Sequence, residues 1–320
     1  MKYGMIPSPP DERDYSLAKA ISYSASPIQE RMVSYIPRPV NQGEFGVCAA
    51  VTLSEVIEAI EFKQRGVVLP ISVKYMYGNR TDRMFQGEGM MPRELLQMAT
   101  KFGAVRYDLL PGLANYPDSK AAITSALDGE GLPSRPYGYV RLQGIQDVND
   151  YMVKYDLPVF FGMYLTPSFF GTMADGIVPP PEGDILGGHA IVVIGIKRIN
   201  EKWYLVLQNS WGTGWGDNGR CYVCLDDKHR GLEMWGIIPE ATELLTNRPQ
   251  QILMTIGKNE YYVDNVRKTM DVSPFIKDDR TYVPLRFMVE ALGARVTPIK
   301  YPDGTYVILS EWGGEQNGGS

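Results

Sequence analysis

The stretch Gln42-Gly43-Glu44-Phe45-Gly46-Val47-Cys48-Ala49-Ala50 decides how this chain is understood. An apolar pattern typical of a helix begins at Cys48, so the thiol is expected in the first turn of that helix. A helix N-terminus favours negative charge, which lowers the pKa of a cysteine placed there. Gln42 carries an amide that can donate a hydrogen bond to an oxyanion. The stretch therefore predicts a reactive cysteine in an acyl-transfer site.

Two distant segments supply the expected partners of this cysteine, Gly188-His189-Ala190 and Gln208-Asn209-Ser210-Trp211-Gly212. His189 stands at the head of an apolar, strand-like run, so a rigid strand is expected to hold its ring at the edge of a cleft. The amide of Asn209, at the end of another strand, can orient the second ring nitrogen of the histidine. Trp211 is expected to shield that hydrogen bond from water, which strengthens it. Cys48, His189 and Asn209 are thus the candidate nucleophile, general base and acid, and orienting residue.

Composition limits the classes of protein that fit. Of the 320 residues, 44% are hydrophobic and 22% charged, as in ordinary globular proteins. A formal net charge of -5 gives no support to a nucleic-acid partner. Residues 1–7 contain no apolar run long enough for a secretory signal, and no segment is long enough to span a membrane. We expect cytoplasmic synthesis, with action outside the cell or in a phage particle left open.

The chain has three cysteines and two histidines. Cys221 and Cys224 lie in a strand-like run that points their side chains to opposite faces, so both are expected to be free, buried thiols. No metal and no cofactor are expected, because a zinc site needs more cysteine or histidine ligands than the chain offers. His229 lies in a charged turn, where a solvated surface position is expected.

Helical patterns come first along the chain. Apolar residues recur at helical spacing from Cys48 to Ile60, and Arg65-Gly66 supplies a cation and a stop. Three glutamates lie largely off that apolar stripe, namely Glu55, Glu58 and Glu61. Further helices are expected over residues 92–103 and near 147–155.

Strand patterns follow, at residues 158–165, 189–196, 202–208 and 220–225. Helices followed by a mostly antiparallel sheet define an α+β fold. A cleft between the two halves is expected to hold Cys48 on one side and His189 on the other. The long loop over residues 166–188 is a candidate rim for that cleft.

The pattern changes near residue 243. Residues 1–242 form the first predicted domain, residues 243–250 a linker, and residues 251–312 a small α+β domain followed by a flexible tail at 313–320. The small domain is expected to contain a hairpin and two more strands around a helix, at residues 252–256, 260–263, 284–293, 295–299 and 305–309.

These residues resemble the papain-like cysteine peptidases, in which histidine and asparagine follow the cysteine by about 130–150 residues. The separation of Cys48 and His189 falls inside that window, and Asn209 lies somewhat beyond it, as an inserted loop would explain. The resemblance covers about residues 5–240 and implies a two-lobed fold with a helical lobe and an antiparallel β lobe. It also implies that Cys48 is the nucleophile, His189 the general base and acid, and Asn209 the orienting residue. Gln42 is then expected to donate to the oxyanion together with the backbone amide of Cys48. The opening of the chain looks like that of bacterial members.

Three positions depart from the family's pattern. Phe45 stands where the family usually has a disulfide cysteine, Val47 where it has serine, and Ala49 where it has tryptophan. None of these changes removes a catalytic group. No stretch before Gln42 is long enough for the usual helical inhibitory propeptide. We therefore expect another form of control, in which the N-terminal arm or the C-terminal domain covers the cleft.

The resemblance also suggests where substrate binds. Residues 87–91 align with the glycine-rich segment that lines the substrate channel of relatives. The candidate substrate-binding residues are Gly89, Met90, Met91 and Trp211. The two methionines fit an apolar pocket and a core position equally well.

The C-terminal segment, including Arg280-Thr281-Tyr282-Val283-Pro284 and Glu290-Ala291-Leu292-Gly293, resembles a domain named after the N-terminus of copper amine oxidases. Copper is not implied, because residues 251–312 contain no histidine and no cysteine. The domain is either a spacer or a module that attaches the enzyme to a cell wall, a surface or a phage particle.

Three functions follow from these residues. The leading one is a bacterial or phage-borne cysteine endopeptidase that hydrolyses protein or peptide substrates through a thioester on Cys48. The second keeps the site but acts as a thiol amidase or transpeptidase on cell-wall peptides. The third is a non-catalytic binding or structural module on the same fold. The joint presence of Gln42, Cys48, His189 and Asn209 argues against the third, because such a module needs no such set.

Overall fold

The structure is a computed structural model of the 320-residue chain. It describes residues 4–11, 14, 16–17, 25–80, 88–131, 134–172, 174–239, 252–263, 266–278, 280–284, 287, 294–301 and 304–312. The chain divides into two compact units, Met1–Glu240 and Ala241–Ser320.

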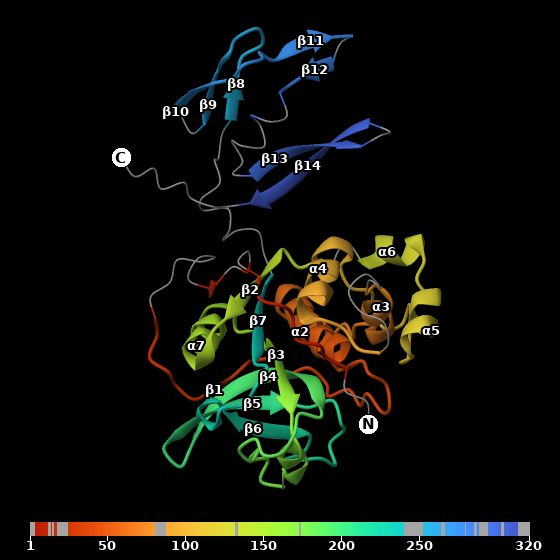
Figure 1. The fold of residues 1–320 in the computed structure, drawn as a ribbon, viewed down its shortest axis with the longest axis vertical. Helices are drawn as coiled ribbons and strands as arrows, with labels where there is room; N and C mark the ends of the chain where they lie inside the picture. The colour runs from red at the N-terminus through yellow and green to blue at the C-terminus, as the bar shows by residue number, and fades with distance from the viewer. Residues whose placement is uncertain are drawn as a thin grey trace. The chain divides into compact units, whose positions relative to one another are not determined.

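The first unit has a helical part, drawn in orange and yellow in Figure 1. Its central helix begins at Cys48 and ends at Gly66, whose left-handed backbone (φ 68°) caps the helix through a hydrogen bond to the carbonyl of Phe62, as the sequence predicts. Three shorter helices were not expected, and side-chain caps from Ser72 and Asn115 start two of them. The helices are α2 (Cys48–Arg65), α3 (Val73–Gly78), α4 (Pro92–Phe102), α5 (Tyr116–Ala121) and α6 (Ser125–Gly131).

Burial of α2 goes further than its apolar stripe predicts. Glu55, Glu58 and Glu61 are buried as well, so the expectation that they lie away from the packed face is wrong. The hydroxyl of Tyr35 donates to Glu58 at 2.6 Å, and Arg65 pairs with Glu61 at 2.9 Å. Glu55 accepts from the backbone N–H of Val40 at 3.3 Å, so all three side chains have a partner, which is the usual condition for burying such a group.

The second part of this unit is a seven-stranded sheet in which every pairing is antiparallel. The strands run in the order β2-β7-β3-β4-β5-β6, with β1 paired to β4. Four strands match the sequence prediction closely: β3 (Val159–Leu165), β4 (Gly187–Ile199), β5 (Lys202–Gln208) and β6 (Arg220–Cys224). Three were not expected: β1 (Arg31–Met32), β2 (Gly138–Leu142) and β7 (Glu233–Ile238).

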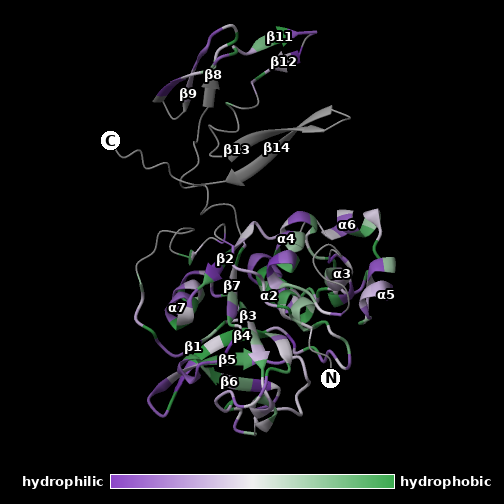
Figure 2. Ribbon diagram, in the orientation of Figure 1, coloured by the Kyte–Doolittle hydropathy of each residue, from purple (hydrophilic) through white to green (hydrophobic). Residues whose placement is uncertain are grey.

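The core lies between α2 and the centre of the sheet, because α2 packs against β3 and β4. In Figure 2 the hydrophobic colouring is concentrated there. The predicted third helix is α7 (Gly144–Tyr155), and short 3-10 turns occur at η2 (Pro167–Gly171) and η3 (Leu225–Asp227). Helices with an antiparallel sheet confirm the predicted α+β, two-part fold. Within the described residues, no helix has the length and apolar character needed to cross a membrane.

The second unit contains short antiparallel pairings. The predicted hairpin is confirmed as β8 (Ile252–Met254) and β9 (Glu260–Val263), and a third strand, β10 (Val266–Thr269), extends it. The last two predicted strands are also confirmed, as β13 (Ala294–Tyr301) paired with β14 (Gly304–Trp312). An unexpected pair joins β11 (Phe275–Lys277) to β12 (Arg280–Tyr282). The linker at 243–250, most of the helix at 284–293 and the tail at 313–320 lie outside the described residues.

Candidate active site

Cys48 is the first residue of α2, and this start of the helix brings its thiol to the sheet. Its Sγ accepts a hydrogen bond from the backbone N–H of Ala190 at 3.4 Å. Ala190 directly follows His189 in β4, so the thiol lies against the start of the strand that carries the histidine. The structure therefore brings together two residues that are far apart in sequence.

His189 and Asn209 are joined directly. The Nε2 atom of His189 lies 2.8 Å from the Oδ1 atom of Asn209. An amide oxygen accepts only, so this contact assigns the ring proton to Nε2 and leaves Nδ1 as the basic nitrogen. The predicted orienting contact is present in the structure.

The turn after β5 fixes Asn209 in place. Its backbone N–H donates to the carbonyl of Gly219 at 2.8 Å, and its Oδ1 also accepts from the backbone N–H of Ser210 at 2.8 Å. An amide held at both its backbone and its side chain has few other rotamers available. Its orientation toward His189 is therefore set before any substrate arrives.

Aromatic side chains surround the histidine–asparagine pair. The rings of Trp211 and His189 are 4.9 Å apart, as expected for a residue that shields the pair from water. Phe170 stacks on Trp211 at 5.5 Å and is itself 42% exposed. Phe169 contacts both Trp211 and Trp215. Sequence reasoning missed the two phenylalanines, and the only signal was their place in the loop predicted to form the rim of the cleft.

Gln42 lies next to the same turn and is buried. Its Nε2 donates to the carbonyl of Phe45 at 2.8 Å, while its Oε1 accepts from the hydroxyl of Ser210. Its backbone N–H donates to the carbonyl of Ser210 at 2.9 Å. One of the two amide protons on Nε2 is thus used within the protein, and among the described residues the other makes no hydrogen bond.

The charge states of the pair differ from those that a helix N-terminus alone predicts. Burial raises the pKa of the Cys48 thiol to about 11, although backbone N–H groups, including that of Ala190, act to lower it. Burial likewise lowers the pKa of His189 to about 4, with the hydrogen bond to Asn209 acting against it. Removal from water thus favours the uncharged thiol and the uncharged imidazole and opposes the effect of the helix terminus.

Both side chains are buried, and the N-terminal segment packs against the site. Cys48 is 0% exposed and His189 is 1% exposed. The backbone N–H of Met5 donates to the carbonyl of Gly188 at 3.1 Å, and a Cβ added at Gly4 would lie 2.1 Å from the carbonyl oxygen of Gly46. Residues 4–6 therefore pack tightly across the site.

Two of the expected substrate-binding residues, Gly89 and Met90, lie against this segment. Met90 and Met91 are 1% and 8% exposed, and Met90 belongs to the hydrophobic core. The backbone of Met90 pairs with the arm on both sides, since its N–H donates to Gly4 at 3.0 Å and its carbonyl accepts from Ile6 at 3.1 Å. Gly89, with φ 106° and the arm's Gly4 close by, lets the chains approach this closely.

The other histidine does not lie on the surface as predicted. His229 is 8% exposed, and burial lowers its pKa while Asp227 acts to raise it. Cys221 and Cys224 are free and buried, as the sequence predicts.

The family comparisons agree with this geometry. Residues 29–239 match the family model of the papain family cysteine proteases, and residues 239–300 match the copper amine oxidase N-terminal domain. The first match covers more than half of the chain. This chain therefore belongs to the papain family of cysteine proteases.

Individual relatives are distant. A cysteine protease of Blomia tropicalis is 25% identical over 221 residues, which cover 66% of this chain and 64% of the relative. Cathepsin Q of Rattus norvegicus is 24% identical over 204 residues, or 61% and 57% of the two chains. The chain thus spans less than two thirds of the length of these curated relatives. The crystal structure of xylellain, a cysteine protease from Xylella fastidiosa, superposes with a TM-score of 0.63 at 20% identity, covering 74% of this chain and 96% of that one.

Proposed function

We propose that this chain is a cysteine endopeptidase that hydrolyses peptide bonds through a thioester on Cys48. The observation that carries the proposal is the 2.8 Å contact between Nε2 of His189 and Oδ1 of Asn209. The residue after His189 in β4, Ala190, donates its backbone N–H to the Cys48 sulfur. A base held by an orienting group and placed beside a nucleophile is the arrangement that nucleophilic acyl transfer needs.

In the proposed reaction, Nδ1 of His189 takes the proton from the Cys48 thiol and the sulfur bonds to the substrate carbonyl carbon. The carbonyl oxygen then carries negative charge, which the backbone N–H of Cys48 and the remaining N–H of Gln42 stabilise. When the carbon–nitrogen bond breaks, the amine leaves with the proton from His189. Water then attacks the thioester, His189 takes its proton, and Cys48 regains a proton as the carboxylic acid leaves.

We also propose that peptide substrates bind along Gly89, Met90 and Met91, with Trp211 beside the leaving group. Since the two methionine side chains are buried, recognition there rests on the backbone of Met90 rather than on its side chain. A backbone N–H and carbonyl that face a ligand pair with an extended peptide in the manner of an added strand.

The organisation of the chain extends the proposal. Residues 1–242 act as the peptidase domain, residues 243–250 as a linker, and residues 251–312 as a module that attaches the enzyme to a cell wall, a surface or a phage particle. A bacterial or phage-borne origin fits this combination. The second candidate, a thiol amidase or transpeptidase on cell-wall peptides, is favoured only by such an attachment module.

One experiment separates these functions. The wild-type chain, Cys48→Ala and Gly4→Val are incubated with an irreversible epoxide-type thiol inhibitor, and in parallel with casein and with purified cell wall. Gly4→Val is included because the added side chain collides with the carbonyl of Gly46. Residues 4–6 then cannot pack across the site, which is open to the reagents. Cys48→Ala is the matched control that keeps the site but lacks the nucleophile.

The endopeptidase predicts epoxide labelling at Cys48 and casein cleavage in Gly4→Val, with both lost in Cys48→Ala. Release of cell-wall peptides without casein cleavage would instead support the amidase or transpeptidase. If Gly4→Val shows neither labelling nor cleavage, both enzymatic functions are overturned and a non-catalytic module remains.

A further inference from the structure

Glu55 carries a carboxyl group that is buried where α2 meets the segment leading to Gln42. The residue belongs to the helix that begins at Cys48 and is 3% exposed. A buried carboxyl group needs hydrogen-bonding partners, because it has lost those that water provides. The proposed reaction does not use this group as an acid, a base or a nucleophile. Its role therefore has to be found in the segments that it connects.

Hydrogen bonds join this carboxyl group to two other segments. Its Oε1 accepts from the backbone N–H of Val40 at 3.3 Å. The side-chain amide of Gln208, at the end of β5, makes a second hydrogen bond to the Glu55 carboxyl. The same amide donates to the carbonyl of Pro37 at 2.9 Å. Glu55 and Gln208 thus hold residues 37–40 from two sides, one from the helix and one from the sheet.

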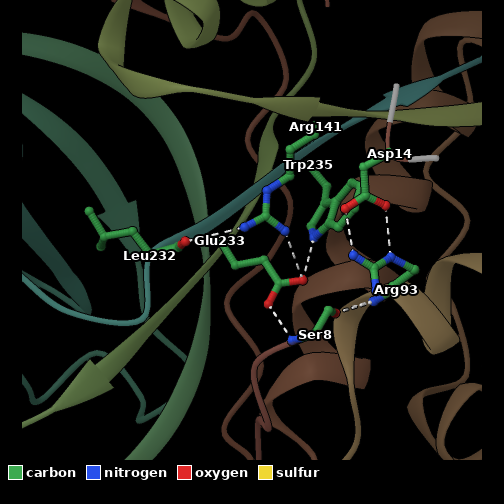
Figure 3. A network of polar contacts seen from close by, with 7 residues as sticks. All are labelled: Ser8, Asp14, Arg93, Arg141, Leu232, Glu233 and Trp235. Atoms are coloured by element: carbon green, nitrogen blue, oxygen red, sulfur yellow. Dashed lines mark hydrogen bonds and ion pairs between the residues drawn. The ribbon is translucent and has the colours of Figure 1, made fainter. Parts of the chain in front are cut away.

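The electrostatic surroundings of Glu55 differ from those of Glu233, another buried carboxylate of the same unit. Figure 3 shows Glu233 beside the guanidinium of Arg141, at 3.2 Å. Within the described residues, no cation is among the groups that act on the Glu55 carboxyl, which are Val40, Glu58 and Gln208. Burial raises the pKa of Glu55 well above its ordinary value, and the neighbouring carboxyl raises it further. Glu55 is therefore suited to accept hydrogen bonds as a neutral acid and not to form an ion pair.

The spacing along α2 places Glu55 on the same side of the helix as Cys48. Seven residues separate them, and seven residues make about two turns, so both side chains leave the helix in nearly the same direction. Their separation along the helix axis is about 10 Å, at 1.5 Å per residue. A segment that is anchored to Glu55 is thus anchored to the face of α2 that presents the thiol.

Val40 lies two residues before Gln42, the proposed oxyanion donor. The loop that joins Gln42 to Cys48 contains two glycines, Gly43 and Gly46. Glycine leaves a chain more conformational freedom than any other residue, so this loop by itself constrains Gln42 weakly. The hydrogen bond from Val40 to Glu55 supplies a constraint from the other direction, and it acts relative to the helix that carries the nucleophile.

We propose that Glu55 is a positioning residue, which anchors Val40 to α2 and so fixes the amide of Gln42 at the distance from Cys48 that oxyanion stabilisation needs. The inference rests on the proposed peptidase function of that same site. Glu55 contacts neither the substrate nor the reacting atoms and acts through residues 40–42. Because the oxyanion forms only on the way through the transition state, displacing Gln42 lowers kcat and leaves KM nearly unchanged.

Two substitutions separate the hydrogen bond of Glu55 from the volume of its side chain. Glu55→Leu keeps a side chain of similar size but leaves the N–H of Val40 without its acceptor. Glu55→Gln keeps an acceptor oxygen and is uncharged, like the neutral acid that burial favours. Glu58→Gln is the matched control, because Glu58 is a buried carboxyl of the same helix that binds Tyr35 instead. All variants are made in the full-length Gly4→Val chain, whose site is open.

The test is a double-mutant cycle between Glu55 and Gln42, with kcat for peptide hydrolysis as the readout. Glu55→Leu should lower kcat roughly tenfold at nearly constant KM, and Glu55→Gln should recover most of that loss. In the Gln42→Ala background, Glu55→Leu should lower kcat by less than about twofold, because the group that it positions is gone. Glu58→Gln should leave kcat unchanged. A tenfold loss in both backgrounds, a loss in neither, or equal losses in Glu55→Leu and Glu55→Gln would overturn the proposal.

The rate of alkylation recognises a folding defect. Iodoacetamide alkylates Cys48 without forming an oxyanion, so this rate should be the same in Glu55→Leu and its parent. If buried Cys221 reacts as fast as Cys48, Glu55→Leu has loosened the whole domain. Gln208→Leu, which removes the hydrogen bond to Pro37, then decides in the same cycle. Its loss of kcat should likewise disappear in the Gln42→Ala background, and equal losses in both backgrounds would overturn the proposal.

The failure of this proposal differs from the failure of the peptidase. If the Gly4→Val parent hydrolyses no peptide, the peptidase is overturned and the role of Glu55 falls with it. If the parent hydrolyses peptide and the two backgrounds show equal losses, the role of Glu55 alone is overturned.

Discussion

Nε2 of His189 lies 2.8 Å from Oδ1 of Asn209, and this contact decides which ring nitrogen is free to act as a base. The same contact raises the pKa of His189, in opposition to the lowering by burial. The asparagine therefore affects both the geometry and the charge of the imidazole.

Replacing Asn209 with alanine should lower kcat roughly 10- to 100-fold, the cost of a catalytic group that is no longer held in place. Because the lost hydrogen bond favoured the imidazolium, the pKa of His189 should fall, and the acid limb of the pH–rate profile, where the base becomes protonated, should move to lower pH. The measurement is peptide hydrolysis by Asn209→Ala in the Gly4→Val background. An unchanged profile would contradict an orienting role.

Replacing Gln42 with alanine should lower kcat by about 10²-fold with little change in KM, because an oxyanion donor acts in the transition state. Gln42 also binds Ser210, so Ser210→Ala is the matched control for a purely structural effect. A similar loss in both variants, accompanied by a lower unfolding temperature, would show that the glutamine only supports the turn.

Removing the indole of Trp211 should weaken the His189–Asn209 bond by letting water reach it. We expect kcat to fall roughly tenfold in Trp211→Ala, which corresponds to about 1.4 kcal/mol, and by less in Trp211→Phe, which keeps an aromatic cover. Steady-state kinetics of the two variants check this. Equal activity of Trp211→Ala and wild type would contradict shielding.

Folding stability should depend on pH through His189. Its pKa in the folded chain is about 4, below the unfolded value near 6.5, so the unfolded state binds more protons between these values. The corresponding stability is present above about pH 6.5 and is lost as the pH falls toward 4. Denaturant unfolding at pH 4.5 and 7 should show this difference in wild type and a smaller one in His189→Gln. The same difference in both proteins would contradict the assignment.

The chemistry of the site could be predicted from sequence because it depends on residue types. A cysteine at a helix start, a histidine at a strand start and an asparagine at a strand end each carry a local signal, and all three come together in the structure. The glycine after Arg65 likewise predicts the end of α2, since only a left-handed cap fits there.

Long-range contacts could not be predicted in the same way. Burial of Glu55 depends on the backbone N–H of Val40, and burial of Glu58 depends on Tyr35, neither of which has a periodic signal. The raised pKa of Cys48 follows from its burial among segments that are distant in sequence. The sequence predicts the helix terminus from local residues, but it does not predict which distant residues exclude water from that terminus.

The central claim is that Cys48 forms a thioester with its substrate. An activated peptide ester is mixed with Gly4→Val for less than one turnover, quenched in acid, and the protein is analysed by intact mass and peptide mapping. The account predicts an acyl adduct on Cys48 that is absent from Cys48→Ala and decays with water as the acceptor. If no acyl adduct forms while iodoacetamide still alkylates Cys48, the account is contradicted.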